Sequence, residues 1–155
     1  MNKRALLCLA IIPLLISCVT VANPRNFVLK EGEGAMVCRI SSETLSIFSL
    51  NLASDSGLAP VVKVKRGDPA KILIVKEGEY HFYNISIGYA SAEFPFAKPF
   101  RVEAGRINYV GDFTYESVGG ARINMGQFDN RDKTMADAYR QIPAMLEYPL
   151  VSIFE

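Results

Sequence analysis

The sequence contains no tryptophan, one histidine and three cysteines among its 155 residues. A single histidine excludes any site that needs two, including the helical zinc motif with a pair of histidines. The 17 basic and 16 acidic side chains leave a formal net charge of +1. Without a broad basic surface, we expect no nucleic-acid partner. The length predicts one folded domain.

Signatures of catalytic and ligand sites are also missing. Gly32-Glu33-Gly34 and Gly119-Gly120 lack the continuations of phosphate-binding loops, and there is no Gly-x-Ser-x-Gly. Asp129-Asn130-Arg131-Asp132 brings oxygen donors together, but it lacks the later glycine and distant glutamate of a calcium loop, which favours a turn before a helix. We therefore predict a protein without catalytic residues, bound metal or cofactor.

The N-terminal hydrophobic run is too short to cross a bilayer, which needs about 20 apolar residues. It extends from Ala5 to Ile16 and follows Lys3 and Arg4. A basic start and a short apolar stretch are typical of a secretory signal peptide.

The end of this run, Leu15-Ile16-Ser17-Cys18, resembles the lipobox of bacterial lipoproteins: an aliphatic residue, a tolerant position, a small residue and a cysteine. The resemblance implies that residues 1–17 are a signal peptide, and that Cys18 is the acylated first residue of the mature chain. Two or three acyl chains would anchor it stably in a membrane. The alternative is ordinary cleavage after Ala22, because Thr20-Val21-Ala22 is an acceptable small-residue site.

The residue after the lipobox bears on location. An aspartate at this position commonly retains such lipoproteins in the inner membrane, and this chain has Val19 instead. The resemblance therefore implies the outer membrane more than the inner, with the domain facing the periplasm or the cell surface.

Removal of the signal peptide and lipidation would also determine which cysteines remain available for a disulfide. Cys8 leaves with the signal peptide and Cys18 is blocked by lipid, so Cys38 has no partner for a disulfide. Cys38 alternates with Met36 and Ile40, so we predict a small buried apolar residue rather than a nucleophile.

Residues 18–26 are predicted to form a small, polar tether, in which Asn23-Pro24 disfavours a helix. Residues 27–155 then form the domain. Its dominant period is two, which places one face of each strand on a core and the other in water. The apolar sets that show this alternation are Met36/Cys38/Ile40, Val62/Val64, Phe100/Val102, Ile107/Tyr109/Phe113/Tyr115 and Ile123/Met125.

Three similar glycine turns separate these segments: Lys30-Glu31-Gly32-Glu33-Gly34, Lys76-Glu77-Gly78-Glu79-Tyr80 and Glu103-Ala104-Gly105-Arg106. Their spacing is too uneven for a solenoid, so we interpret them as one hairpin turn used three times. Ile72-Leu73-Ile74-Val75 is apolar on both faces and predicts a central strand. The fold class is mainly β, an antiparallel sandwich of seven to eight strands.

One short C-terminal helix is predicted near residues 132–147, with Asp132 as its cap and an apolar stripe from Met135 to Leu146. Pro143 predicts a kink or restart near Ile142. We expect this helix to plug an open end of the sandwich or to cover an edge, and Leu150 to Phe154 to return as a last strand.

The order of these motifs resembles a second family. Gly78-Glu79-Tyr80, then Pro99-Phe100-Arg101-Val102-Glu103-Ala104-Gly105, then Asn108-Tyr109-Val110-Gly111-Asp112-Phe113 is similar to a pattern in uncharacterised bacterial lipoproteins with a prealbumin-like sandwich, akin to carboxypeptidase regulatory domains. The resemblance covers about 35 residues and implies a fold and a location. It implies no catalytic residues.

The candidate binding segment is the aromatic crossover from Tyr89 to Phe100, which also holds Phe94, Phe96 and two prolines. Proline keeps main-chain donors out of sheet ladders, so part of this segment is expected at the surface, where exposed aromatics would form a contact patch. The alternative is that Phe94 and Phe96 fold down as a lid over the end of the sandwich.

These observations predict a lipid-anchored cell-envelope protein that works as a non-catalytic binding or assembly module, with another envelope protein as partner. One alternative is an envelope hydrolase that uses carboxylates such as Glu79 or Asp112. A structural or immunity-type lipoprotein is the other. A stripe of Glu79, His81 and Tyr83 on one strand face fits either a proton-transfer site or an ordinary polar surface.

Overall fold

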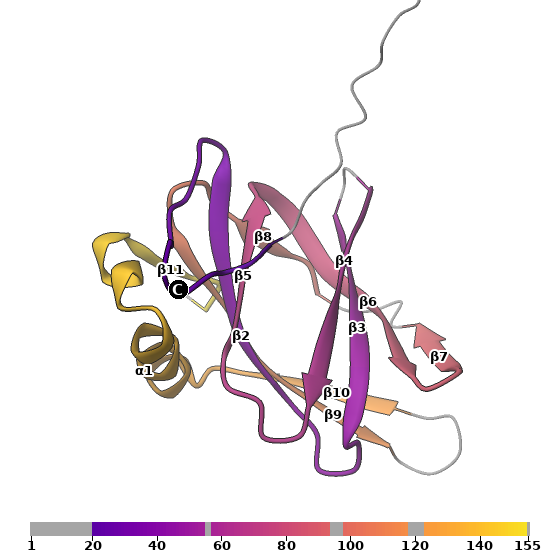
Figure 1. Cartoon of the computed structure of the whole chain (residues 1–155). Helices are drawn as coiled ribbons and strands as arrows, with labels where there is room; N and C mark the ends of the chain where they lie inside the picture. Colours follow the sequence, from indigo (N-terminus) through magenta and orange to yellow (C-terminus); the bar gives the residue numbers. More distant parts are fainter. Residues whose placement is uncertain (1–19, 55–56, 94–97, 118–122, 155) are drawn as a thin grey trace, which may run out of the picture.

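The computed structural model describes residues 20–54, 57–93, 98–117 and 123–154, and within them it shows eleven strands in two sheets. The fold is mainly β with one short C-terminal helix, which confirms the predicted class (Figure 1). The structure has more strands than the seven or eight predicted because it includes four short strands. β1, β7, β8 and β11 have two to four residues each.

The first sheet has the order β1-β5-β2-β9-β10, and β11 also pairs with β9. Its strands are β1 (Thr20–Val21), β2 (Glu33–Ser41), β5 (Lys71–Lys76), β9 (Ile107–Ser117), β10 (Ile123–Phe128) and β11 (Leu150–Ser152). The pairs of β9 with β2 and with β11 are parallel, so this sheet is mixed.

The second sheet has the order β4-β3-β6-β7, with β8 also on β6, and all its pairs are antiparallel. Its strands are β3 (Ile47–Ser54), β4 (Gly57–Lys65), β6 (Gly78–Ile87), β7 (Ala90–Glu93) and β8 (Phe100–Val102).

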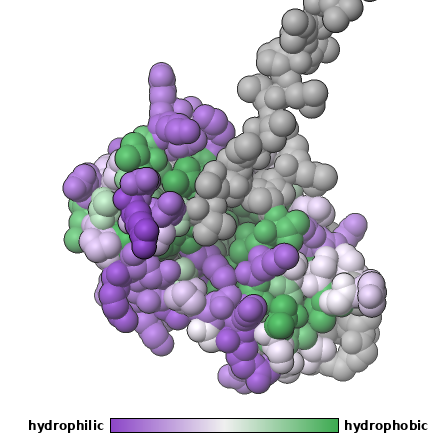
Figure 2. All heavy atoms as spheres, viewed as in Figure 1, coloured by the Kyte–Doolittle hydropathy of each residue, from purple (hydrophilic) through white to green (hydrophobic). Residues whose placement is uncertain are grey.

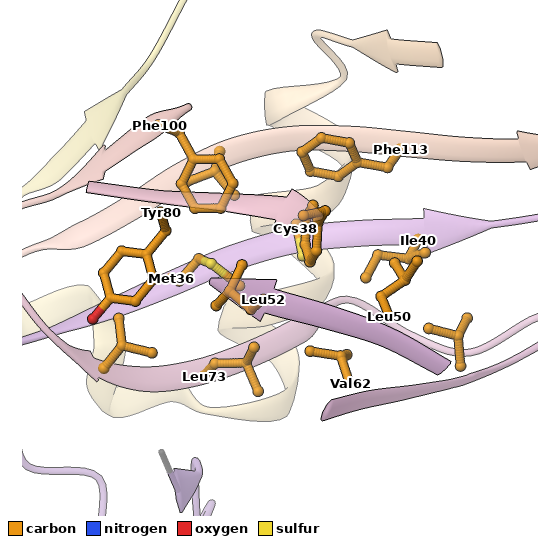
Figure 3. Packing of buried hydrophobic residues seen from close by; sticks show 14 of the residues in the cluster. Met36, Cys38, Ile40, Leu50, Leu52, Val62, Leu73, Tyr80, Phe100 and Phe113 are labelled. Carbon is orange, nitrogen blue, oxygen red and sulfur yellow. The ribbon is translucent and has the colours of Figure 1, made fainter. Parts of the chain in front are cut away.

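The main core lies between the inner faces of the two sheets. Met36, Cys38 and Ile40 of β2 meet Leu50 and Leu52 of the second sheet (Figure 3), and Phe82 belongs to the same cluster; all six are at most 2% exposed. Cys38 is a free, fully buried thiol, as its alternation with Met36 and Ile40 predicted.

A second core lies on the outer face of the first sheet, under the helix α1 (Arg131–Gln141) and a 3-10 turn (Pro143–Glu147). The side chains that form it include Ala35, Val37, Ile72, Ile107, Tyr109, Met135, Ala138, Ile142 and Met145. The predicted restart near Ile142 is confirmed. The predicted position of the helix is wrong, because it covers a sheet face rather than an end or an edge (Figure 1). We name the two sheets accordingly: the helix-covered sheet and the solvent-facing sheet.

Strand β9 changes face along its length. Val37 pairs with Tyr109 but Arg39 pairs with Asp112, so β9 has one extra residue at this point. Gly111 allows this bulge with a φ of +103°. Ile107 and Tyr109 therefore pack under α1, whereas Phe113 and Tyr115 enter the main core. The expectation that all four share one face was wrong, because a single added residue reverses the alternation.

The N-terminal segment is part of the sheet. Thr20 and Val21 pair with Ile74 and Leu73 of β5, and the N–H of Ala22 donates to the Ile72 carbonyl at 3.3 Å. Ala22 and Phe27 are buried at 7% and 6% exposure. From Thr20 onward, the segment predicted as a tether is therefore attached to the domain through a short edge strand.

Candidate functional site

The β6–β7 hairpin carries the most exposed aromatic residue of the described chain. Ile87 pairs with Ala90, which leaves a turn of two residues, Gly88 and Tyr89. Gly88 has a φ of +58°, as the first central residue of a type II′ turn requires. The Tyr89 side chain is fully exposed. A tight turn therefore presents this ring to solvent on a rigid support.

Phe100, also predicted as a binding residue, lies in the main core at 4% exposure. Its ring centroid lies 5.8 Å from that of Phe82 and 6.4 Å from that of Tyr80. Figure 3 shows Phe100 and Tyr80 among the core side chains. Phe100 pairs with Tyr80 across the two strands, and the strand alternation turns its side chain inward. The prediction that Phe100 belongs to a surface patch is therefore wrong.

Three predicted residues lie outside the described residues: Cys18, Phe94 and Phe96. Of the predicted aromatic patch, the structure leaves Tyr89 at the surface and moves Phe100 into the core.

The stripe of Glu79, His81 and Tyr83 lies on the outer face of β6, because Tyr80 and Phe82 between them point into the core. Glu79 is exposed, and the other two side chains are half-buried. Across the sheet, Glu79 is paired in register with Arg101 of β8. The arrangement is an open polar surface.

Asp112 is the centre of a buried polar group between β9 and α1. The Thr134 hydroxyl donates to both Asp112 carboxylate oxygens, at 2.8 and 3.0 Å, and the Tyr109 hydroxyl lies 3.3 Å from Oδ1. The Tyr109 oxygen in turn accepts the Asn130 N–H at 2.9 Å. These bonds connect the start of the helix to the bulge in β9.

Burial, and then the nearby Asp112 carboxylate, raise the pKa of Tyr109 above its ordinary value. Its hydroxyl therefore keeps its proton and can act as a donor. Since Tyr109 and Thr134 are fully buried and Asp112 is 6% exposed, this cluster supports the helix and has no open face for a substrate.

A second polar contact holds the middle of the helix. Arg39 Nη2 donates to Asp137 Oδ2 at 2.8 Å, and the same oxygen accepts the Ala70 N–H at 2.8 Å. Sequence analysis did not identify Arg39, Thr134 or Asp137. Their helical spacing could have identified two of them. Thr134 and Asp137 are three residues apart and next to the apolar stripe, so a helix places both on the side that faces the sheet.

Asp112 and Glu79, the carboxylates considered for a hydrolase, lie on opposite outer faces of the molecule. Asp112 faces α1 on the helix-covered sheet, and Glu79 faces solvent on the other sheet. Stacked sheets are about 10 Å apart, and the full core separates these outer faces. These two groups do not share a cleft.

The segment Asp129–Asp132 is the start of α1. The Asp129 side chain accepts the Arg131 N–H at 3.1 Å, and Asn130 occupies the N-cap position without a side-chain cap bond. The prediction that Asp132 caps the helix was wrong, since it lies in the first turn. Among the described residues, no three His, Cys, Asp or Glu side chains come together as metal ligands.

A cavity of about 390 Å³ opens at one edge of the sandwich, between β4, β5 and the end of α1. Its walls are mostly apolar and include Ala22, Val62, Ile72, Leu73 and Ile142. Two polar groups at its wall are already engaged: the Gln141 amide donates to the Ala70 carbonyl, and Lys71 pairs with Asp68. A specific small-molecule site needs convergent polar groups, and these two do not supply them.

No known protein family, curated protein or solved structure matches this chain. In the part of the chain that the structure describes, no helix is long and apolar enough to span a membrane.

Proposed function

We propose that this protein is a lipid-anchored component of the bacterial cell envelope that binds another envelope protein and does not catalyse a reaction. Cys18, at the end of the lipobox-like Leu15-Ile16-Ser17-Cys18, is the proposed lipid-bearing residue. The outer membrane is the proposed location because Val19 replaces the retaining aspartate.

The observation that carries the binding proposal is Tyr89. The two-residue turn fixes the backbone at Tyr89, so binding through this fully exposed ring would order only its side chain and no loop. Tyrosine is enriched among the residues that dominate protein interfaces, since it offers a large apolar area and a polar end. Phe94 and Phe96 are the proposed additional contacts, close behind it in sequence.

The binding proposal is tested by photocrosslinking in living cells from position 89, followed by mass identification of the adduct. We expect one envelope protein in the adduct. Ala136, an exposed residue on α1, is the control position and should give no matching adduct. No adduct from position 89, or the same adducts from both positions, would contradict the proposed contact surface.

The anchor is tested by labelling cells with a palmitate analogue. We expect the label on the wild-type chain and none on Cys18→Ser, which should also leave the membrane fraction. Cys38→Ser is the control: it keeps Cys18 and should keep the label. Label on Cys18→Ser, or none on the wild type, would overturn lipidation at Cys18.

A further inference from the structure

The sandwich has two distinct ends, and three glycine turns meet at one of them. The N–H of Glu77 donates to the Gly32 carbonyl at 2.9 Å, and the N–H of Gly105 donates to the Glu33 carbonyl at 2.8 Å. Asn108 adds to this contact, since its side chain accepts the Glu103 N–H and donates to the Ala35 carbonyl. We call this the entry end, defined by the turns at Gly32, Glu77–Gly78 and Gly105.

The chain enters the domain at this end. β1 is antiparallel to β5, and Thr20 pairs with Ile74, two residues before the last residue of β5 at Lys76. One residue, Val19, separates Thr20 from Cys18. Two extended residue steps reach only about 7 Å.

The opposite end carries Tyr89. β6 begins at Gly78 in the entry end and runs for ten residues to Ile87, directly before the Gly88-Tyr89 turn. At about 3.3 Å per residue, this strand places the Tyr89 turn about 30 Å from the entry end. Figure 1 shows the same separation along β6: its first residues lie beside the end of β5, and β7 lies at its other end. We call this second end the far end.

We propose that the entry end lies directly on the membrane surface, and that the far end, with Tyr89, points away from it. This inference rests on the proposed lipid anchor at Cys18. The docking of β1 removes most of the spacer that the sequence suggested, so the Cα of the proposed acylated Cys18 can lie at most about 7 Å from the first strand. The domain therefore has one orientation on the membrane, and Tyr89 is held at a fixed height for a partner.

The charges at the entry end indicate that the anchor, and not electrostatic attraction, holds it there. Its turns carry both signs of charge without a basic excess: Lys30, Glu31, Glu33, Lys76, Glu77, Glu103 and Arg106. Figure 2 shows hydrophilic residues over the β2 side of this end. Attraction to anionic lipids needs a cluster of basic residues and weakens with salt. We expect contact at this end to be insensitive to salt.

The test compares two exposed glutamates, Glu77 at the entry end and Glu43 in the β2–β3 connection at the far end. Each is replaced by cysteine in the full, lipidated protein and labelled with one fluorophore. Cys38 does not compete, because it is fully buried. The proteins are reconstituted into vesicles of phosphatidylethanolamine and phosphatidylglycerol that contain brominated lipid.

We expect bromine to quench the probe at position 77 at least threefold more than the probe at position 43. A flexible insertion of twelve Gly/Ser residues between Val19 and Thr20 should remove that difference and leave the protein in the membrane. Equal quenching at both positions, or stronger quenching at 43, would overturn the orientation while the anchor stands. If the lipidated protein without the insertion does not stay in the vesicles, both the anchor and the orientation are overturned.

Discussion

The two sheets differ in what covers their outer faces. On the solvent-facing sheet, Glu79, His81 and Tyr83 face water and each inward neighbour is buried. On the helix-covered sheet, Val37 and Tyr109 are buried on the outer face as well. The difference teaches that strand alternation identifies a one-sided sheet well, but it misreads a sheet that packs on both faces. It also separates the roles: both sheets form the main core, the helix-covered sheet carries a second core on its outer face, and the β6–β7 turn of the solvent-facing sheet presents Tyr89.

The largest effect should come from removing the buried carboxylate at the outer face of the helix-covered sheet. Asp112→Ala leaves the Thr134 and Tyr109 hydroxyls without this acceptor, so we expect the free energy of unfolding to fall by about 3 kcal/mol in urea titrations. Glu79→Ala, the matched change on the solvent-facing sheet, should have little effect. Equal losses for the two variants would remove the distinction between the sheets.

Two glycine substitutions, one in each sheet, test the same comparison between the helix-covered and the solvent-facing sheet. Gly111→Ala keeps a φ of +103° and puts a Cβ 3.2 Å from Gln127 and Phe154, so we expect a loss of about 2 kcal/mol. Gly88→Ala in the β6–β7 turn also has positive φ, but nothing lies within 4 Å, and about 1 kcal/mol should be lost. Thermal unfolding measures both. A larger loss at Gly88 would contradict this ranking.

Cys38, between the sheets, predicts a pH dependence. Burial, and then the Asp112 carboxylate, raise the pKa of its thiol from 9.0 to about 12. As pH rises above 9, the unfolded chain releases this proton first, so the thiol lowers stability progressively up to about pH 12, by about 1.4 kcal/mol per pH unit. Urea titrations at pH 8 to 10.5 should show a shallower decline in Cys38→Ala than in wild type. Parallel declines would show that the thiol is not the cause.

The smallest effect is expected for His81 on the solvent-facing sheet. The His81→Ala variant should change the free energy of unfolding by about 0.5 kcal/mol or less, because the side chain lies on an open polar face. Urea titration at pH 7 checks this value. A loss above 2 kcal/mol would show a supporting role for the Glu79–His81–Tyr83 stripe that the open geometry does not indicate.

Prediction from sequence succeeded where local pattern controls structure. Val62 and Val64 are buried between exposed lysines, Cys38 is buried, and the helix ends before Pro143. It failed where a distant partner decides. For Phe100 the alternation with Val102 predicted burial and the aromatic crossover predicted a surface patch, and only the pairing of β8 with β6 decided for burial. The face change at Gly111 was equally invisible, since a bulge depends on how β9 pairs with β2.

The candidate site divides in the same way. Tyr89 was expected at the surface because its segment contains two prolines, a local signal, whereas the two-residue turn that exposes it depends on the pairing of β6 with β7. The Asp112–Thr134 contact joins residues 22 apart in the chain, and Arg39 and Asp137 are 98 apart. Such pairs form only when the helix packs on the sheet, so no single segment contains the information.

By itself, the sequence determined the class of fold, the position of the turns and the burial of the thiol, because strand alternation, glycine turns and proline act over a few residues. The interpretation of the three glycine turns as hairpins was wrong: those at Gly78 and Gly105 join strands of different sheets, and the strands on either side of Gly32 do not pair with each other. The tertiary structure alone decided which face the helix covers, that the segment after Val19 is a docked strand, and that this strand and Tyr89 lie at opposite ends of the sandwich. These features depend on pairing between distant segments, whose hydrogen bonds and apolar contacts exist only in the folded chain.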